Sequence, residues 1–176
     1  MVGLGVLPGG SVFSFATAVS ADGLVLVGRS NSAAGVEAFR WTAAGGMVGL
    51  GDLPGGKVES LAYAVSGDGA IVVGAGTTAV GQEAFIWDAV HGMRKLDEVL
   101  TGLGLDLTGW RLWAANDVSS DGRYVVGRGS HSGGEEAWIA DLPEPSFGLL
   151  AGALALIGLH RRAVRSGRAL GRLDLS

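Results

Sequence analysis

The sequence predicts an all-β protein built from repeated four-stranded antiparallel units that resemble the blades of a β-propeller. Glycine supplies 32 of 176 residues while 48% of the residues are hydrophobic, which is typical of short strands joined by tight turns. A gap-free internal repeat covers most of the chain. We therefore expect an incomplete, open arc of about three blades, followed by a C-terminal hydrophobic helix.

The repeat has three units, at residues 1–46, 47–92 and 93–141. The first two align at an offset of 46, and 27 of the 46 aligned positions are identical. The third is more divergent and matches the second at an offset of 53 from Asp117 onward. The first two units share Leu-Pro-Gly-Gly, Ala-Val-Ser-x-Asp-Gly, Val-Gly and Glu-Ala-Phe-x-Trp. The third keeps Val-Ser-x-Asp-Gly, Val-Gly and Glu-Ala, lacks Leu-Pro-Gly-Gly, and has Trp138 and Ala140 where Phe and Trp stand in the other units.

Each unit reads as four short strands. In the first unit, apolar runs on both sides of an Asp-Gly turn predict a hairpin, and alternation that places Phe39 and Trp41 on one face predicts a third strand. Four strands in roughly 40–50 residues match a propeller blade, whereas the coils of a β-solenoid, the alternative, are usually shorter. The expected strands are 15–20, 24–28, 37–42 and 47–50, with a break at 53–56.

An Asp-Gly pair recurs in every unit. Asp and Gly satisfy the geometry of a tight turn, and a row of carboxylates that binds Ca²⁺ is the alternative. The chain has no Cys and three His far apart, so we expect no cofactor and no metal site. The turn residues are Asp22, Gly23, Asp68, Gly69, Asp121 and Gly122.

A glutamate also recurs, at positions 37, 83 and 136, each before Ala and an aromatic residue. We expect it to end a strand in a hydrogen bond or at solvent, while the aromatic side chains pack between blades. The alternative is a shared channel or saccharide-binding face formed with Trp41 and Trp87. A paired-carboxylate glycosidase needs two acids at a set separation, which the sequence does not place, so no enzyme is predicted.

The repeat motifs resemble the HAF family of extracellular repeats over about residues 1–141. That resemblance implies a secreted or surface protein and brings no established activity. Because residue 1 begins in register with a repeat, we expect Met1 to be an internal methionine, with further repeats and a secretory signal upstream.

The C-terminal region has a different composition. Residues 1–145 carry 8 Lys/Arg and 16 Asp/Glu, a net charge of −8, whereas residues 146–176 carry five Arg and one Asp, a net +4. An uncharged apolar run at 147–159 follows Pro143, Glu144 and Pro145 and ends before Arg161 and Arg162. As a helix this run would be about 20 Å long, and the arginines after it favour a membrane helix with a cytoplasmic end. A helix docked on the last blade is the alternative.

Residues 142–165 resemble a PEP-CTERM sorting signal, with a basic tail at 166–176. The resemblance implies an exported protein of a Gram-negative bacterium, held transiently in the inner membrane by helix 147–159 and processed by exosortase. Pro143, Glu144 and Pro145 match the sorting motif, and Arg161 and Arg162 match the basic end that sets orientation.

Together these features predict a non-catalytic envelope or extracellular protein with a binding or matrix role. The expected partners are exosortase, the inner membrane and extracellular polysaccharide, and the acidic body argues against nucleic acid. The alternative is a propeller-type extracellular polysaccharide hydrolase or lyase whose site lies in missing blades. Ice binding would require regular threonine arrays, and threonine is sparse.

Overall fold

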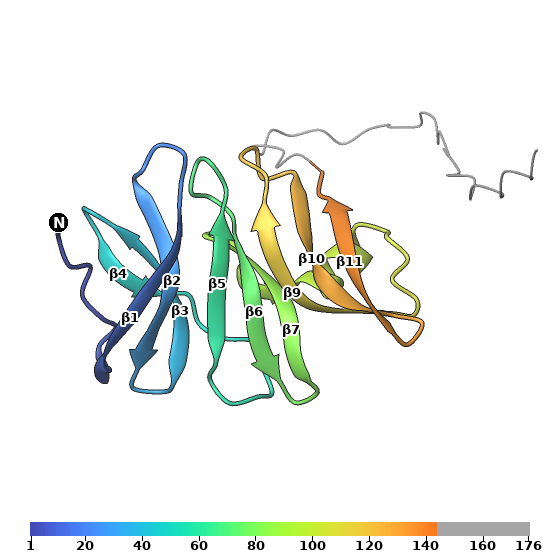
Figure 1. The fold of residues 1–176 in the computed structure, drawn as a ribbon, viewed down its shortest axis with the longest axis horizontal. Helices are drawn as coiled ribbons and strands as arrows, with labels where there is room; N and C mark the ends of the chain where they lie inside the picture. Colours follow the sequence, from blue (N-terminus) through green and yellow to red (C-terminus); the bar gives the residue numbers. More distant parts are fainter. Residues whose placement is uncertain (144–176) are drawn as a thin grey trace, which may run out of the picture. The chain divides into compact units, whose positions relative to one another are not determined.

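The computed structural model describes residues 1–143, which belong to one compact unit, Met1–Pro145. Within this range the chain forms three antiparallel sheets of four, four and three strands, together with one short helix (Figure 1). In each sheet, strands that are neighbours in the sequence are also neighbours in space. The all-β prediction is confirmed.

The first sheet closely follows the predicted strands. The Asp22-Gly23 turn joins the first two strands, and the third pairs with the fourth from Phe39↔Gly49 to Thr42↔Gly46. The first strand begins earlier than predicted, because residues 9–14 lie beside the end of the second strand. The pairing of these two strands is irregular between Gly9 and Ser14. The strands are β1 (Gly9–Val19), β2 (Val25–Ser32), β3 (Val36–Thr42) and β4 (Gly46–Gly49).

The second sheet repeats this arrangement and adds a helix. Leu96 and Leu100 lie on one face of that helix and are at most 1% exposed, so the helix is anchored in the core by its apolar side. Sequence reasoning placed no helix there. The elements are β5 (Ser60–Val65), β6 (Val72–Thr78), β7 (Gly81–Asp88), β8 (Gly92–Lys95) and α1 (Leu96–Gly102).

Within residues 1–143 the third sheet has three strands. It contains β9 (Trp110–Val118), β10 (Tyr124–His131) and β11 (Gly134–Asp141). In the other sheets a Gly-Met dipeptide opens the fourth strand, and the equivalent positions after β11, from residue 145 onward, lie outside the described residues. Up to residue 143, no strand covers the outer edge of β11.

Successive sheets pack through the first strand of the later sheet. Strand β5 contacts β1, β2 and β3, and β9 contacts β5, β6 and β7. Phe39 and Phe85 are fully buried at equivalent positions of the third strands. One core cluster joins the first and second sheets, and another joins the second and third sheets with α1.

A glycine in the second strand of each sheet permits close approach of the first strand. A Cβ atom at Gly28, Gly74 or Gly127 would come within 2.0–2.1 Å of a carbonyl oxygen of that strand. At Gly74 the ring of Phe85 lies 2.8 Å from the same position, so two neighbours occupy the space of a side chain. The Val-Gly motif of the repeat is therefore a packing requirement.

The sheets are offset from the sequence repeat. The first unit ends at residue 46, but β4 extends to Gly49 and β8 extends to Lys95. Each four-stranded sheet therefore takes its outer strand from the first residues of the next sequence unit. Residues 1–4, which are identical in sequence to residues 47–50, form no strand.

Candidate functional site

The three Asp-Gly turns share one hydrogen-bond network. In each, a serine hydroxyl donates to the aspartate carboxylate two residues later, from Ser20, Ser66 and Ser119. The same carboxylate accepts a backbone N–H two residues further on, at 2.9–3.0 Å. The glycines at positions 23, 69 and 122 have φ of 71–74°, a conformation that favours glycine.

These hydrogen bonds stabilise the charged carboxylates. The serine hydroxyl is the largest cause of a lowered pKa at Asp22, Asp68 and Asp121, followed by the backbone N–H. Each carboxylate is thus already engaged within its own turn. No group of three metal-ligating side chains occurs among residues 1–143. All three Asp-Gly pairs lie in tight turns closed by hydrogen bonds within the turn.

The structure brings the three turns into one row. The N–H of Ala21 donates to the carbonyl of Gly67 at 3.0 Å, and the N–H of Gly67 donates to the carbonyl of Ser120 at 2.8 Å. These three residues occupy equivalent repeat positions, and their turns lie along the upper edge of the sheets in Figure 1. Gly69 also packs against Val25, because a Cβ there would lie 2.4 Å from the valine side chain.

The repeated glutamates are partnered separately. Glu37 accepts the N–H of Gly51 at 2.9 Å, and the buried Glu83 lies 3.4 Å from the ammonium of Lys95. Glu136 is exposed and lies 3.8 Å from His131. The expected strand-end hydrogen bond is present at Glu37.

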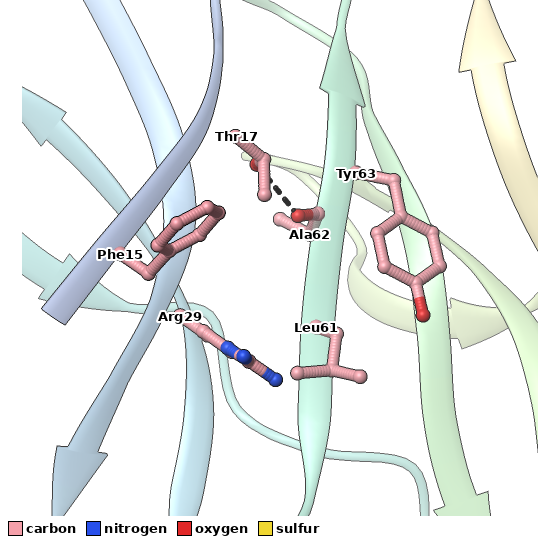
Figure 2. A pocket seen from close by; sticks show the side chains of 6 residues that line it. All are labelled: Phe15, Thr17, Arg29, Leu61, Ala62 and Tyr63. Atoms are coloured by element: carbon pink, nitrogen blue, oxygen red, sulfur yellow. Dashed lines mark hydrogen bonds between the residues drawn. The ribbon is translucent and has the colours of Figure 1, made fainter.

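A cavity of about 200 Å³ lies between the first sheet and β5 (Figure 2). The hydroxyl of Thr17 donates to the carbonyl of Ala62 at 2.8 Å and so joins its two sides. Sequence reasoning did not select this site. Its lining residues are Phe15, Thr17, Arg29, Leu61, Ala62 and Tyr63.

Arg29 is the charged residue of this cavity. Its guanidinium carbon lies 5.7 Å from the ring centroid of Phe13 and 5.8 Å from that of Phe15, which are cation–π distances. Among the described residues, no carboxylate forms an ion pair with it. The pKa of Glu59 is lowered mainly by its hydrogen bond with Lys57. The positive charge of Arg29 lowers this pKa by a smaller amount. The cation is therefore available to an anionic ligand.

The cavity lies where the repeats differ from one another. Arg29 corresponds to Ala75 in the second unit, and Phe15 corresponds to Leu61. A comparison of the aligned units that looked for positions where the residues differ, and not only for identical positions, would have identified Arg29 and Phe15.

The predicted sorting residues lie at the end of the described region. Pro143 is exposed and outside any strand. Glu144, Pro145, helix 147–159, Arg161 and Arg162 lie outside the described residues. No helix within residues 1–143 is both long and apolar enough to cross a membrane.

Comparison of the chain with protein-family models finds no matching family, and comparison with curated proteins finds no similar sequence. The interpretation of the site therefore depends on its own geometry and on the sequence motifs.

Proposed function

We propose that this chain is an exported bacterial envelope or extracellular repeat protein that binds an anionic polysaccharide without catalysis. The observation that carries the binding proposal is the Arg29 guanidinium, which is flanked by aromatic rings in a cavity and has no carboxylate partner among the described residues. The sorting motif, apolar run and arginine cluster of residues 142–165 support the proposal of export.

We further propose that the sheets are propeller-like blades. Three features support this architecture: antiparallel four-stranded sheets, a chain order that matches the spatial order within each sheet, and packing of each sheet on the next through its first strand. The hydrogen bond between turns recurs at both junctions between the described sheets, which is the pattern expected of blades related by a constant rotation.

The chemistry of the cavity suits an acidic sugar. A guanidinium can bind a carboxylate through two parallel hydrogen bonds, and an aromatic face packs against the C–H groups of a sugar ring. Phe15 of β1 and Leu61 of β5 line the cavity from different strands, so a ring-sized group would meet apolar surface while its carboxylate reaches Arg29. The volume fits a single sugar residue of a chain better than a larger ligand.

Binding of polygalacturonate, with dextran as the neutral control, tests this assignment. We expect Arg29→Gln to weaken binding of the acidic polymer about 10-fold or more, since a hydrogen bond to a charged group is worth about 1.5–3 kcal/mol. Arg128→Gln is the matched control, because Arg128 is the repeat equivalent of Arg29 and lies outside the cavity. Equal affinity of the Arg29→Gln protein, or equal binding of dextran, would refute the proposal.

Sorting is tested separately by following a tagged protein in cells that contain exosortase. We expect Glu144→Ala, or deletion of residues 147–176, to change the size of the mature product. Identical maturation with and without these changes would show that the sorting assignment is wrong.

A further inference from the structure

A carboxylate stands beside the Arg29 cavity and is held by two partners. Glu59 lies two residues before Leu61, which lines the cavity and toward which the Arg29 side chain extends (Figure 2). Its Oε2 is 2.7 Å from the Lys57 ammonium and accepts the Thr77 hydroxyl at 3.4 Å. In the part of the chain that the structure describes, Glu59 and Arg29 form no ion pair. The carboxylate is therefore a neighbour of the cavity's cation without being its partner.

The register of the strands places Glu59 close to Arg29. Arg29 pairs with Ala38 across β2 and β3, and the N–H of Ala38 donates at 2.9 Å to the hydroxyl of Ser60, the residue after Glu59. The charge of Arg29 lowers the pKa of Glu59, although by less than the hydrogen bond with Lys57 does. The two opposite charges thus attract each other across a gap.

The backbone of Glu59 is fixed on both sides. Its N–H donates to the Asp52 carboxylate at 3.1 Å, and its carbonyl accepts the N–H of Thr77 at 3.0 Å. A parallel bridge to Val36 adds a third connection, at the start of β3. Because these contacts hold the backbone, the side-chain torsions of Glu59 decide which cation its carboxylate meets.

The ion pair is a departure from the repeat. Lys57 and Glu59 correspond to Ser11 and Phe13 of the first unit, and that segment forms part of β1 without either charge. The fold therefore does not require the pair. Phe13, in turn, is one of the two rings that flank Arg29, at 5.7 Å from its guanidinium carbon. Both versions of this repeat position thus lie next to the same guanidinium.

We propose that Glu59 competes with the anionic ligand for Arg29, and that Lys57 is a positioning residue that keeps Glu59 away from the cation. This inference rests on the proposed binding of an acidic polysaccharide. The carboxylate of Glu59 and that of an acidic sugar are the same chemical group, so a two-hydrogen-bond contact with the guanidinium serves one or the other. The affinity for the polymer is then set by how firmly Lys57 retains Glu59.

A double-mutant cycle on the full chain tests this competition. Binding of polygalacturonate is measured for the unmodified protein, Lys57→Gln, Glu59→Gln and the double variant, with circular dichroism as the check of folding. A mild non-ionic detergent accommodates the apolar run at 147–159. The salt concentration is about 0.1 M, where the screening length is about 10 Å, so neighbouring charges still interact.

Glu98→Gln is the matched control for the change in net charge. Glu98 is exposed, lies 3.7 Å from the ammonium of Lys95 and does not line the cavity. Like Glu59→Gln, the substitution removes one carboxylate that is paired with a lysine. It therefore measures how far the general charge of the body alone affects binding of the polymer.

We expect Lys57→Gln to weaken binding about 2–5-fold, a small factor because an exposed ion pair contributes little free energy. Glu59→Gln should strengthen binding by a similar factor, whereas Glu98→Gln should leave it unchanged. In the Glu59→Gln background, Lys57→Gln should have no further effect, because Lys57 acts through Glu59.

An equal loss from Lys57→Gln in both backgrounds would overturn the proposal, since it would show that Lys57 contacts the polymer directly. Unchanged affinity of either single variant would also overturn it, as would equal gains from Glu59→Gln and Glu98→Gln. Failure of the proposed function gives a different result. The unmodified chain then does not bind polygalacturonate, or Arg29→Gln binds it equally well, and both proposals fall together.

Discussion

The backbone N–H of Gly67 donates to the carbonyl of Ser120 at 2.8 Å, and the two residues occupy the same place in successive repeats. Gly67 is at the same time the acceptor for Ala21. One peptide position therefore acts as donor toward the following unit and acceptor toward the preceding one, and it links the turns independently of the β-ladders. The side chain at this position also matters, because a Cβ at Gly67 would lie 2.1 Å from the Ser120 hydroxyl.

Ala21→Pro should destabilise the chain by removing the hydrogen bond to Gly67. Like Ser120, Ala21 stands second in its turn, so proline fits the local conformation and the loss is confined to one N–H. We expect a decrease of about 0.5–1.5 kcal/mol in the free energy of unfolding relative to Ser120→Pro, measured by urea denaturation of dilute protein. Ser120→Pro is the control, since it loses no hydrogen bond within a single chain. Equal stability of the two variants would show that the link contributes nothing.

Ser66→Ala should destabilise more than Ser119→Ala, although both remove the same hydrogen bonds. Ser66 is 1% exposed, donates to Asp68 and accepts the N–H of Ile71 at 3.0 Å. Its removal leaves the part-buried N–H of Ile71 without this partner beneath the surface, which costs up to about 1–3 kcal/mol, whereas water can replace the hydroxyl at the half-exposed Ser119. Thermal and urea unfolding of both variants measure the difference, and a larger effect at Ser119 would contradict this argument.

Stability should fall in acid through the turn carboxylates. The pKa of Asp68 is lower in the folded chain, chiefly because of the Ser66 hydroxyl, so the folded state binds its proton less readily than the unfolded state. The resulting stabilisation is fully present above the unfolded pKa of about 4 and is lost as the pH falls through the lower folded value. We expect Asp68→Asn to reduce the slope of unfolding free energy against pH between about pH 5 and 2. A slope identical to that of the unmodified chain would rule out this contribution.

Gly74→Ala should be among the most damaging small substitutions in the chain. The added methyl group would meet the Leu61 carbonyl and the Phe85 ring at 2.0 and 2.8 Å, so β5 or the ring must move. We expect a loss of about 1–3 kcal/mol or more. Gly102→Ala is the control: it stands at the end of α1 with nothing within 4 Å, and alanine there should be neutral or stabilising. Comparable losses for the two variants would show that close approach at Gly74 is not the cause.

Most strands could be predicted because the repeat shows the sequence pattern of each strand twice. The turn after Val19 and the alternation from Glu37 to Trp41 appear twice, and the strands follow them. The helix was missed for a physical reason that could have been read from the sequence. Leu96, Val99 and Leu100 stand at helical spacing, but they fall in the stretch where the third unit diverges, and no repeat drew attention to them.

The cavity could not have been predicted from single motifs. Arg29 and Leu61 lie 32 positions apart in sequence and meet only because β5 packs against β2. Strand pairing follows from local patterns, whereas the approach of two sheets depends on which faces they bury. The repeat suggested this approach in general terms, but the half-buried Arg29 at its edge stands where the second unit has Ala75.

The three-residue offset between sequence unit and sheet has a consequence for how such a gene can change. Because β4 ends at Gly49 and β8 at Lys95, insertion of one whole 46-residue period within the first two units would add one complete four-stranded sheet and leave the pairing within the other sheets unchanged. Recombination between these two units, which are identical at 27 of 46 aligned positions, would then vary the length of the array while preserving its interior.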